Sequence, residues 1–189
     1  MKTTLIQIAN VQTGIYALPV KSGKVVYLQA KHFNENGILL DTVEPELALN
    51  SQTQKHLLNE GDIILAAKGT KNFASKYESK NGKCVASSTF LVIRLKEEFR
   101  DIVNPDYLSW FLNHSKTQEW IKVAARGSSM TSIPKAKLQE LEITLPAIEK
   151  QQLIVNINAL QYTEYRLMNQ IHQLKKKYTQ HLLITAINQ

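Results

Sequence analysis

The chain has 189 residues, of which 43% are hydrophobic and 21% are charged, and these proportions predict a soluble globular protein with a buried core. The net charge of +7 indicates a polyanionic partner, nucleic acid before an anionic membrane. A single cysteine, Cys84, excludes an internal disulfide, and five scattered histidines give no metal-ligand spacing. No apolar run approaches the roughly 20 residues of a membrane span, and the N-terminus lacks an apolar signal core. We therefore expect a cytoplasmic protein.

Residues 1–146 mix short apolar runs with polar loops, whereas the rest of the chain lacks Gly and Pro beyond Glu149. Several of the runs alternate with a period of two, which is typical of strands. Asn81-Gly82 is a strong signal for a tight turn between two of them. The predicted strands are Leu5–Val11, Val25–Gln29, Ile38–Leu40, Asp62–Ala67, Lys83–Ala86, Phe90–Leu95 and Glu142–Leu145.

Two helices are predicted between Pro105 and Ala125. Asn104 can cap the first helix, with Pro105 at its first position, and the second is expected to begin near Thr117 and to end at Gly127. A short helix at Pro134–Leu141 follows. The aromatic residues of these helices are expected in the core: Tyr107, Trp110, Phe111 and Trp120. Strands and helices mix without a βαβ rhythm, so we predict an α+β, mixed-sheet domain over residues 1–146.

The segment 147–189 is predicted to form one long helix. Its apolar residues recur mostly every three or four positions, although Glu164 interrupts the series. A helix of about 40 residues is roughly 60 Å long, which exceeds one face of a small domain, so we expect it to pair with another helix as a coiled coil. An ordinary helix folded back on its own domain is the alternative. The expected pairing residues are Leu153, Ile157, Leu160, Leu167, Ile171, Leu174, Tyr178 and Leu182.

Two small, polar, basic loops are the candidate binding elements. Residues 66–76 leave a buried strand and become cationic, and residues 126–131 have the same character with an added arginine. Such loops bring ammonium groups to phosphates and hydrogen-bonding side chains to base edges, although composition alone is also compatible with two solvated surface loops. The candidate DNA contacts are Lys68, Gly69, Thr70, Lys71, Asn72, Lys76, Arg126 and Ser128.

No catalytic site is predicted. Asn104-Pro105-Asp106-Tyr107 is similar to the Asn-Pro-Pro-Tyr signature of amino-methyltransferases, but Asp replaces the second Pro and no Gly-rich cofactor turn lies upstream. A helix start explains the whole tetrapeptide. A metal-dependent nuclease would need Glu-x-Lys after Pro105-Asp106, whereas Glu119 and Lys122 are separated by two residues.

Two stretches in order resemble the specificity subunit of type I restriction–modification systems. The first is Gly61-Asp62-Ile63-Ile64-Leu65-Ala66-Ala67-Lys68-Gly69. The second runs from Pro105-Asp106-Tyr107-Leu108 through Ala125-Arg126-Gly127-Ser128 and Ile133-Pro134-Lys135 to Leu145-Pro146, and continues into Glu149-Lys150-Gln151-Gln152. The likeness covers about residues 60–189 well and the first 60 residues only loosely.

The resemblance implies a non-catalytic target-recognition domain that binds one half of a split DNA site, followed by a helix that docks methyltransferase subunits. Those partners would carry S-adenosylmethionine, and a restriction subunit could join them. A complete specificity subunit has two recognition domains and two helices, whereas this sequence has one of each. We therefore expect a homodimer with antiparallel helices that reads a palindromic two-part site. The alternatives are a stand-alone DNA-binding regulator, a coiled-coil assembly protein without DNA preference and an unrecognised methyltransferase or nuclease.

Overall fold

The computed structural model describes residues 1–69, 72–125 and 132–187. The chain divides into two compact units, Met1–Gln151 and Gln152–Gln189. The strands are β1 (Lys2–Thr4), β2 (Ala9–Thr13), β3 (Val25–Leu28), β4 (Pro45–Leu47), β5 (Ile63–Ala66), β6 (Ala74–Lys76), β7 (Cys84–Ala86), β8 (Phe90–Leu95) and β9 (Glu142–Thr144). The α-helices are α1 (Leu5–Ile8), α2 (Ser51–Lys55), α3 (Pro105–Asn113), α4 (Ser115–Ala124), α5 (Lys135–Gln139) and α6 (Ile148–Ile187), and three short 3-10 helices are η1 (Ala30–His32), η2 (Ser79–Asn81) and η3 (Glu97–Phe99).

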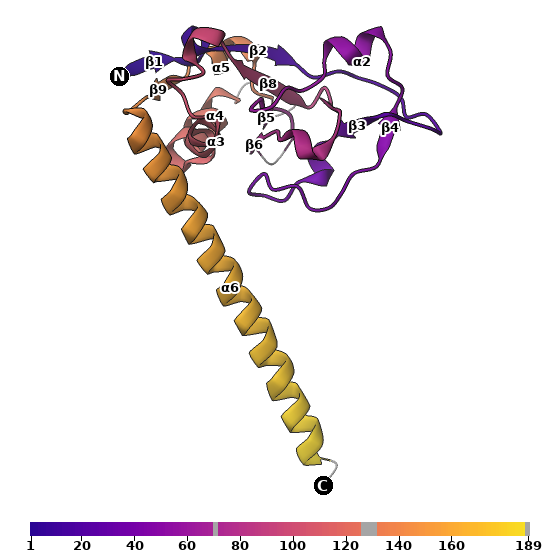
Figure 1. Cartoon of the computed structure of the whole chain (residues 1–189). Helices are drawn as coiled ribbons and strands as arrows, with labels where there is room; N and C mark the ends of the chain where they lie inside the picture. The colour runs from indigo at the N-terminus through magenta and orange to yellow at the C-terminus, as the bar shows by residue number, and fades with distance from the viewer. Residues whose placement is uncertain (70–71, 126–131, 188–189) are drawn as a thin grey trace. The chain divides into compact units, whose positions relative to one another are not determined.

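A four-stranded antiparallel sheet of order β2-β8-β5-β6 is the centre of the first unit (Figure 1). Its inner strands β5 and β8 are almost entirely buried, which explains why their sequences are continuous apolar runs. Arg94 is the single half-buried residue in β8. These two strands confirm the predictions at Asp62–Ala67 and Phe90–Leu95.

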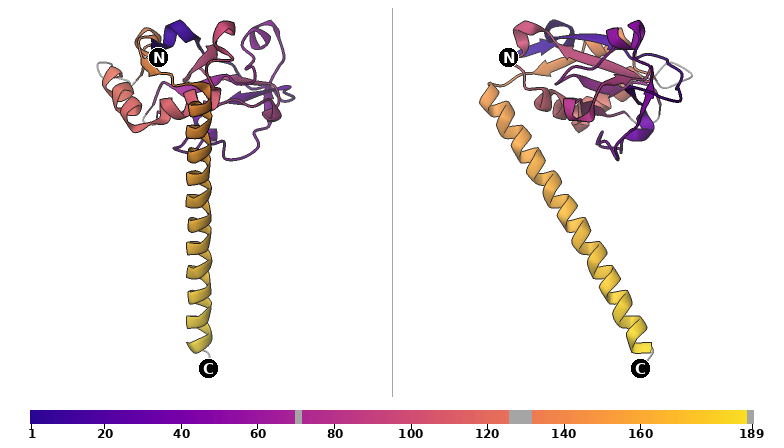
Figure 2. Two further views of the ribbon diagram at one scale, coloured as in Figure 1. Left: turned by 60° about the vertical axis from the view of Figure 1, so that its left-hand side comes forward. Right: turned by 45° about the vertical axis from the view of Figure 1, so that its right-hand side comes forward.

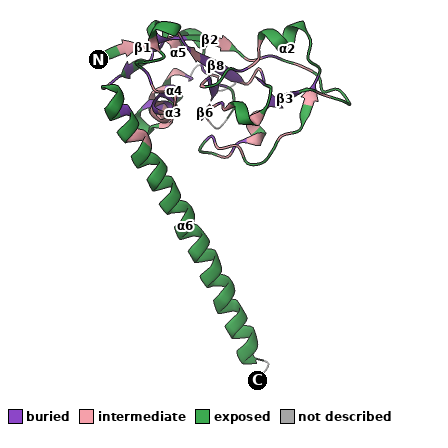
Figure 3. Cartoon of the chain, viewed as in Figure 1, coloured by how far each residue is buried: buried purple, intermediate pink, exposed green. Residues whose placement is uncertain are grey.

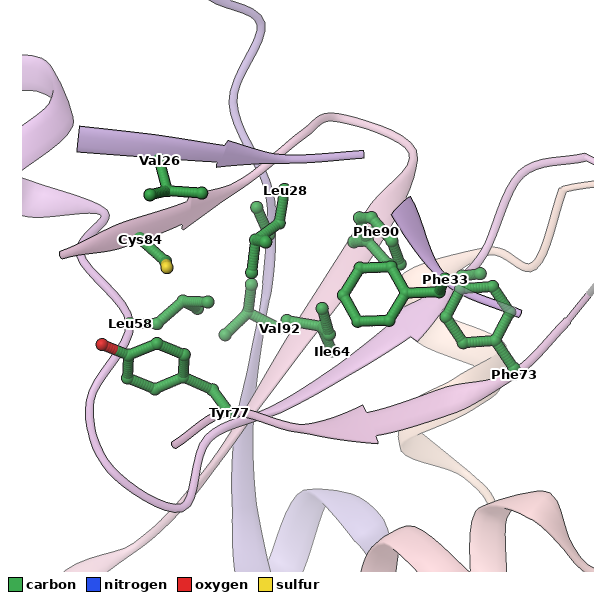
Figure 4. Packing of buried hydrophobic residues seen from close by; sticks show 12 residues of the cluster. Val26, Leu28, Phe33, Leu58, Ile64, Phe73, Tyr77, Cys84, Phe90 and Val92 are labelled. Carbon is green, nitrogen blue, oxygen red and sulfur yellow. The ribbon is translucent and has the colours of Figure 1, made fainter. Parts of the chain in front are cut away.

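A smaller three-stranded sheet of order β4-β3-β7 lies beside the first, with β3 and β7 parallel. The main hydrophobic core joins residues of both sheets (Figure 4). Within it the rings of Phe33, Phe73 and Phe90 contact one another, with centroids 5.4 to 5.9 Å apart. Such tilted and edge-to-face contacts add to the apolar area that the rings bury. The remaining buried members are Val26, Leu28, Leu58, Ile64, Ala66, Tyr77, Cys84, Ala86 and Val92.

The helices α3 and α4 follow the sequence prediction closely. The side chain of Asn104 accepts a hydrogen bond from the backbone N–H of Asp106 at 2.8 Å, and Pro105 occupies the first turn. The prediction of Asn104 as an N-cap is therefore confirmed. The second helix begins at Ser115, two residues before Thr117. Helices α3 and α5 pack against the edge strands β6 and β2, respectively.

The expected core position of the aromatic side chains holds only for Tyr107. Its ring is 3% exposed, and its hydroxyl donates to the carbonyl of Thr144 at 2.6 Å. Trp110, Phe111 and Trp120 are only half-buried. Leu108 and Leu112, four positions apart, form the buried face of α3 with Tyr107, and the rings of Trp110 and Phe111 lie on its flanks.

The start of the chain differs from the prediction of a strand at Leu5–Val11. Leu5–Ile8 forms one helical turn before β2 begins at Ala9. The side chain of Gln7 accepts from the backbone N–H of Thr4 at 2.9 Å, which stabilises this turn. Ile38–Leu40 also forms no strand, because Leu39 makes only an isolated bridge with Phe33. The strands β1, β4 and β6 and the helix α2 have no counterpart in the prediction.

The first unit closes where its two ends meet, as Figure 2 shows from two further sides. Strand β1 pairs antiparallel with β9. The fully buried side chain of Gln151 then joins the first turn of α6 to the segment before α3. Its carbonyl accepts from the N–H of Asn104 at 2.9 Å, and its amide donates to the carbonyls of Ile102 and Pro146 at 2.9 and 2.8 Å. All the polar atoms of this buried side chain therefore have partners.

The second unit consists of α6 from Gln152 onward. The whole helix has 40 residues, which corresponds to about 60 Å, and confirms the predicted long helix. Beyond Gln151 nearly every described residue is exposed (Figure 3).

Candidate nucleic-acid interface

The residues that flank the two predicted DNA-binding loops lie together. Lys68 and Ser132 form an isolated antiparallel bridge, and the N–H of Ile133 donates to the carbonyl of Ala67 at 2.9 Å. Lys68 follows β5, whereas Ser132 and Ile133 precede α5. Two polar segments about 60 positions apart in the sequence therefore converge at one end of the four-stranded sheet.

A third polar segment, Ser87–Thr89, lies beside Ala67 and Lys68. The carbonyl of Thr89 accepts from the N–H groups of Ala67 and Lys68 at 2.9 and 3.2 Å, and the hydroxyls of Ser87 and Thr89 are 2.7 Å apart. These three residues are not among the DNA contacts predicted from the sequence. The run Ser87-Ser88-Thr89 between two apolar strands is a turn signal that could have found them.

Lys68 is the predicted contact that the structure leaves most available. Its side chain is exposed, and it makes no ion pair with the described residues. The next residue, Gly69, is also exposed and has a φ of +114°, with open space where a Cβ would lie. This left-handed backbone favours glycine. The predicted contacts Thr70, Lys71, Arg126 and Ser128 lie outside the described residues.

Asn72 has a structural role within its own loop. Its side-chain amide donates to the carbonyl of Ala66 at 2.9 Å, while the N–H of Ala66 donates to the carbonyl of Phe73 at 2.8 Å. These two bonds close the loop at its base. The predicted contact between Asn72 and a base edge stays a prediction. One N–H of the Asn72 side-chain amide is already bonded to the carbonyl of Ala66.

Lys76 is held by two carboxylates. Its ammonium lies 2.7 Å from Asp106 in the first turn of α3 and 3.6 Å from Glu78. Burial acts to lower the pKa of Lys76, but the hydrogen bond and the charge of Asp106 outweigh burial and raise the pKa. Lys76 therefore ties strand β6 to helix α3, and its contact with DNA stays a prediction.

The other end of α3 is tied to the same strand by Asn113. Its side-chain carbonyl accepts from the N–H of Ala74 at 2.8 Å, and its amide donates to the carbonyl of Ala74 at 2.8 Å. Since β6 is the edge strand that follows the Lys68 loop, α3 fixes the strand into which this loop leads. The two residues lie 39 positions apart, and no local signal in the sequence pairs them.

The residues that resembled a catalytic signature all have structural partners. Asn104 caps α3, Asp106 pairs with Lys76, and Tyr107 bonds to the carbonyl of Thr144. Glu119 and Lys122 are both exposed on α4. Across the described ranges, no three His, Cys, Asp or Glu side chains are grouped so that they could hold a metal ion.

The second candidate surface is the apolar series along α6. Its members remain between 46% and 69% exposed in the single chain: Leu153, Ile157, Leu160, Leu167, Ile171, Leu174, Tyr178 and Leu182. A row of this length on a helix indicates a surface that pairs with another helix. The described helices include none that is both long and apolar enough to cross a membrane.

Comparison with known proteins places this arrangement in a family. The family model described as "Type I restriction modification DNA specificity domain" matches residues 5–176. A search of curated proteins found no match.

Three solved structures have a similar fold. One is a chain from a study of the assembly and conformational transition of the type I restriction–modification system, with 15% identity, a TM-score of 0.64 and coverage of 88% of this chain and 39% of that one. The S subunit from M. genitalium has 18% identity, a TM-score of 0.58 and coverage of 89% and 40%. The HsdS subunit from Thermoanaerobacter tengcongensis has 17% identity, a TM-score of 0.58 and coverage of 86% and 37%.

The chain thus spans about two fifths of the length of these neighbours. At such low identity the neighbours establish the fold, whereas the family model matches most of the sequence directly. The chain belongs to the family of type I restriction–modification DNA specificity domains.

Proposed function

We propose that the chain reads one half of a bipartite DNA site and lends this specificity to a type I methyltransferase complex. The observation that carries the proposal is the bridge between Lys68 and Ser132. It joins the bases of two polar loops in a basic protein whose family supplies DNA specificity.

The loops would enter the major groove, where base edges are distinguishable. Exposed Lys68 would contact a phosphate and supply affinity that falls with salt. The half-buried hydroxyls of Ser88 and Thr89 would add donors and acceptors beside it, whereas Ser87 is buried and bonded to Thr89. Residues 70–71 and 126–131 complete the proposed contact set from the sequence alone, with Thr70, Lys71, Arg126 and Ser128 as its members.

The exposed series on α6 would pair with the same series of a second copy in antiparallel orientation. A twofold dimer of this kind reads a palindromic site in two halves, and the paired helices set the distance between them. The same helices would dock methyltransferase subunits, which carry S-adenosylmethionine and the methylation chemistry. A restriction subunit would join that assembly.

The test is a measurement of mass and DNA preference on the whole chain. Light scattering should give a dimer of twice the 21.5 kDa chain mass, and the mass should rise when a type I methyltransferase subunit is added. Selection from random duplexes, with and without that subunit, should enrich a split palindrome, most strongly in the complex. Tight and specific binding by the isolated dimer would favour a stand-alone regulator, and a dimer with no enriched sequence would favour an assembly protein.

A further inference from the structure

The exposed apolar series of α6 has the spacing of a coiled-coil heptad with one charged position in its middle. The d positions are Leu153, Leu160, Leu167, Leu174 and His181. The a positions are Ile157, Glu164, Ile171, Tyr178 and Thr185. A polar residue at a single a position costs stability but fixes register and partner orientation. If the helix pairs, we therefore expect Glu164 to lie beside a cationic residue of the partner helix.

Glu164 has no such partner on its own helix. Leu160, Gln161, Leu167 and Met168 occupy the positions three and four residues away, where side chains on one helix face meet. Arg166 is two positions away, a spacing at which side chains on one helix do not face each other. The lysine cluster Lys175–Lys177 on the same helix is at least 11 positions away, or roughly 17 Å along the axis.

The lysine cluster likewise lacks acidic neighbours. No Asp or Glu follows Glu164 in the sequence, so all the charged side chains of α6 beyond Glu164 are basic. In a single chain, the charges of Glu164 and the lysines are separate. A second copy of the helix can bring them together.

We propose that two copies of α6 pair antiparallel in the register that places Glu164 beside Lys175 of the second copy. The inference rests on the antiparallel dimer of the proposed function and adds its register. In antiparallel coiled coils, a positions lie level with d positions of the partner, and each knob fills a hole of four residues. In this register Glu164 lies level with Leu174 of the second copy, and its hole consists of Ile171, Leu174, Lys175 and Tyr178.

The central layers fit the same register. Ile171 lies level with Leu167 of the second copy, and Tyr178 with Leu160, so both make apolar layers. The two outer layers pair Ile157 with His181 and Leu153 with Thr185 of the second copy. Beside the core, the e positions of the two helices face each other. Met168 then faces Met168 of the second copy, and Ile154 faces Leu182, so apolar side chains meet apolar side chains. The overlap runs from Leu153 to Thr185, nearly the whole described helix.

Other pairings place no lysine beside Glu164. A shift of one heptad in either direction replaces Lys175 with Met168 or Leu182 of the second copy. The shift that brings Leu182 there also sets Glu164 level with His181, but it shortens the overlap of the two described helices. A parallel dimer in register stacks Glu164 on Glu164 and the lysine clusters on each other, which is repulsive. Charge complementarity thus selects one register among the apolar alternatives.

Charge reversal tests the proposed contact on the full-length chain. Glu164→Lys and Lys175→Glu should each weaken dimerisation about a hundredfold, because each places like charges together at two symmetric sites. The double variant should recover most of the wild-type dissociation constant, measured by sedimentation. Lys176→Glu is the matched control: position 176 faces away from the seam, so it should change the constant less than about threefold.

Disulfide trapping tests the register independently. Met168→Cys should cross-link readily to Met168→Cys of the second copy under mild oxidation, whereas Gln161→Cys, one heptad or about two helical turns away on the same face, should not. The wild-type chain is the control, because its one cysteine, Cys84, is fully buried and should not cross-link. A dimer in which charge reversal has no effect, or in which Gln161→Cys cross-links in preference to Met168→Cys, would overturn the register and leave the proposed dimer standing. A monomeric wild-type chain would overturn both.

Discussion

The side chain of Asn113 and the backbone of Ala74 exchange two hydrogen bonds, each 2.8 Å long. The amide at the end of α3 thereby takes the place of a further strand beside β6, whose exposed edge would otherwise have an unpaired N–H and carbonyl. Together with the ion pair between Lys76 and Asp106, it holds both ends of β6. The loop that begins at Lys68 leads into this strand, so α3 also fixes one side of the proposed DNA interface.

We expect Asn113→Ala to destabilise the first unit by about 1–3 kcal/mol, because it leaves the N–H and carbonyl of Ala74 without protein partners. Urea unfolding measures this loss. Asn36→Ala is the matched control, since Asn36 is exposed and only its backbone N–H is bonded to another residue, Asn34. Amide hydrogen exchange at Ala74 should also become faster in Asn113→Ala. Equal effects of the two variants would show that the amide does not hold the strand.

The buried carboxylate of Asp62 gives a second prediction. Asp62 is 2% exposed, accepts from Arg94 Nε at 2.8 Å and also accepts from the N–H of Asn59 at 2.8 Å. Arg94→Met should cost about 3 kcal/mol, because it leaves a buried charge without its counter-ion. Asp62→Asn combined with Arg94→Met should cost less than Arg94→Met alone, since the uncompensated charge is gone.

An exposed ion pair provides the control for the Arg94 and Asp62 variants. Lys137 and Glu140 are 2.9 Å apart, with side chains 55% and 60% exposed. Lys137→Met should change the free energy of unfolding by less than about 1 kcal/mol. If Arg94→Met were equally mild, the Asp62 carboxylate would have to be stabilised by its backbone contact alone.

A third prediction concerns alkaline pH. Burial raises the pKa of the Cys84 thiol to about 12, and burial, with a smaller effect of the neighbouring Cys84 charge, raises the pKa of Tyr77 to about 12. Both groups thus keep their protons in the folded chain after the unfolded chain has released them. Their contribution to stability is complete below about pH 9 for Cys84 and pH 10 for Tyr77, and it is lost as the pH rises toward 12.

The free energy of unfolding, measured in urea between pH 8.5 and 11.5, should therefore fall less steeply in Cys84→Ala than in the wild type. Val85→Ala is the matched control, because it removes fully buried atoms from the same strand without removing a titrating group. Both variants lower stability at neutral pH, but only Cys84→Ala should lose part of the pH dependence. The same slope in both would assign the alkaline loss to other groups.

The sequence predicted correctly those parts of the fold that depend on interactions between residues close together in the chain. The cap at Asn104 and the long α6 are confirmed because a capping side chain and a repeated helical period act within a few residues. The edge strand β6 was missed because its three residues are stabilised by β5 and by Asn113, which lies 39 positions away. The helical turn at Leu5–Ile8 was interpreted as a strand because four apolar and polar residues do not distinguish the two periods.

In the candidate site, too, the local features were predicted and the contacts between residues far apart in the sequence were not. The sequence singled out Lys68 because a basic loop follows a buried strand, but it could not show that Ser132 lies against it or that the Ser87–Thr89 turn joins them. It also assigned Asn72 and Lys76 to DNA, from the chemistry of the basic loop and, for Asn72, from its position just after a strand that resembles the family. The partners that engage their side chains, Ala66 and Asp106, become visible only in three dimensions.

The last prediction separates a phosphate contact by Lys68 from general basicity. Lys68→Ala should weaken DNA binding by a similar factor for all sequences and reduce the slope of log K against log salt by about 1, because one phosphate contact is lost. Binding measured by fluorescence anisotropy between 50 and 200 mM salt gives both quantities. Lys137→Ala removes the same charge from an exposed site that is already paired with Glu140, so it should leave the slope unchanged. Equal slopes for the two variants would remove Lys68 from the interface, whereas a change in the preferred sequence would assign it to a base edge instead of a phosphate.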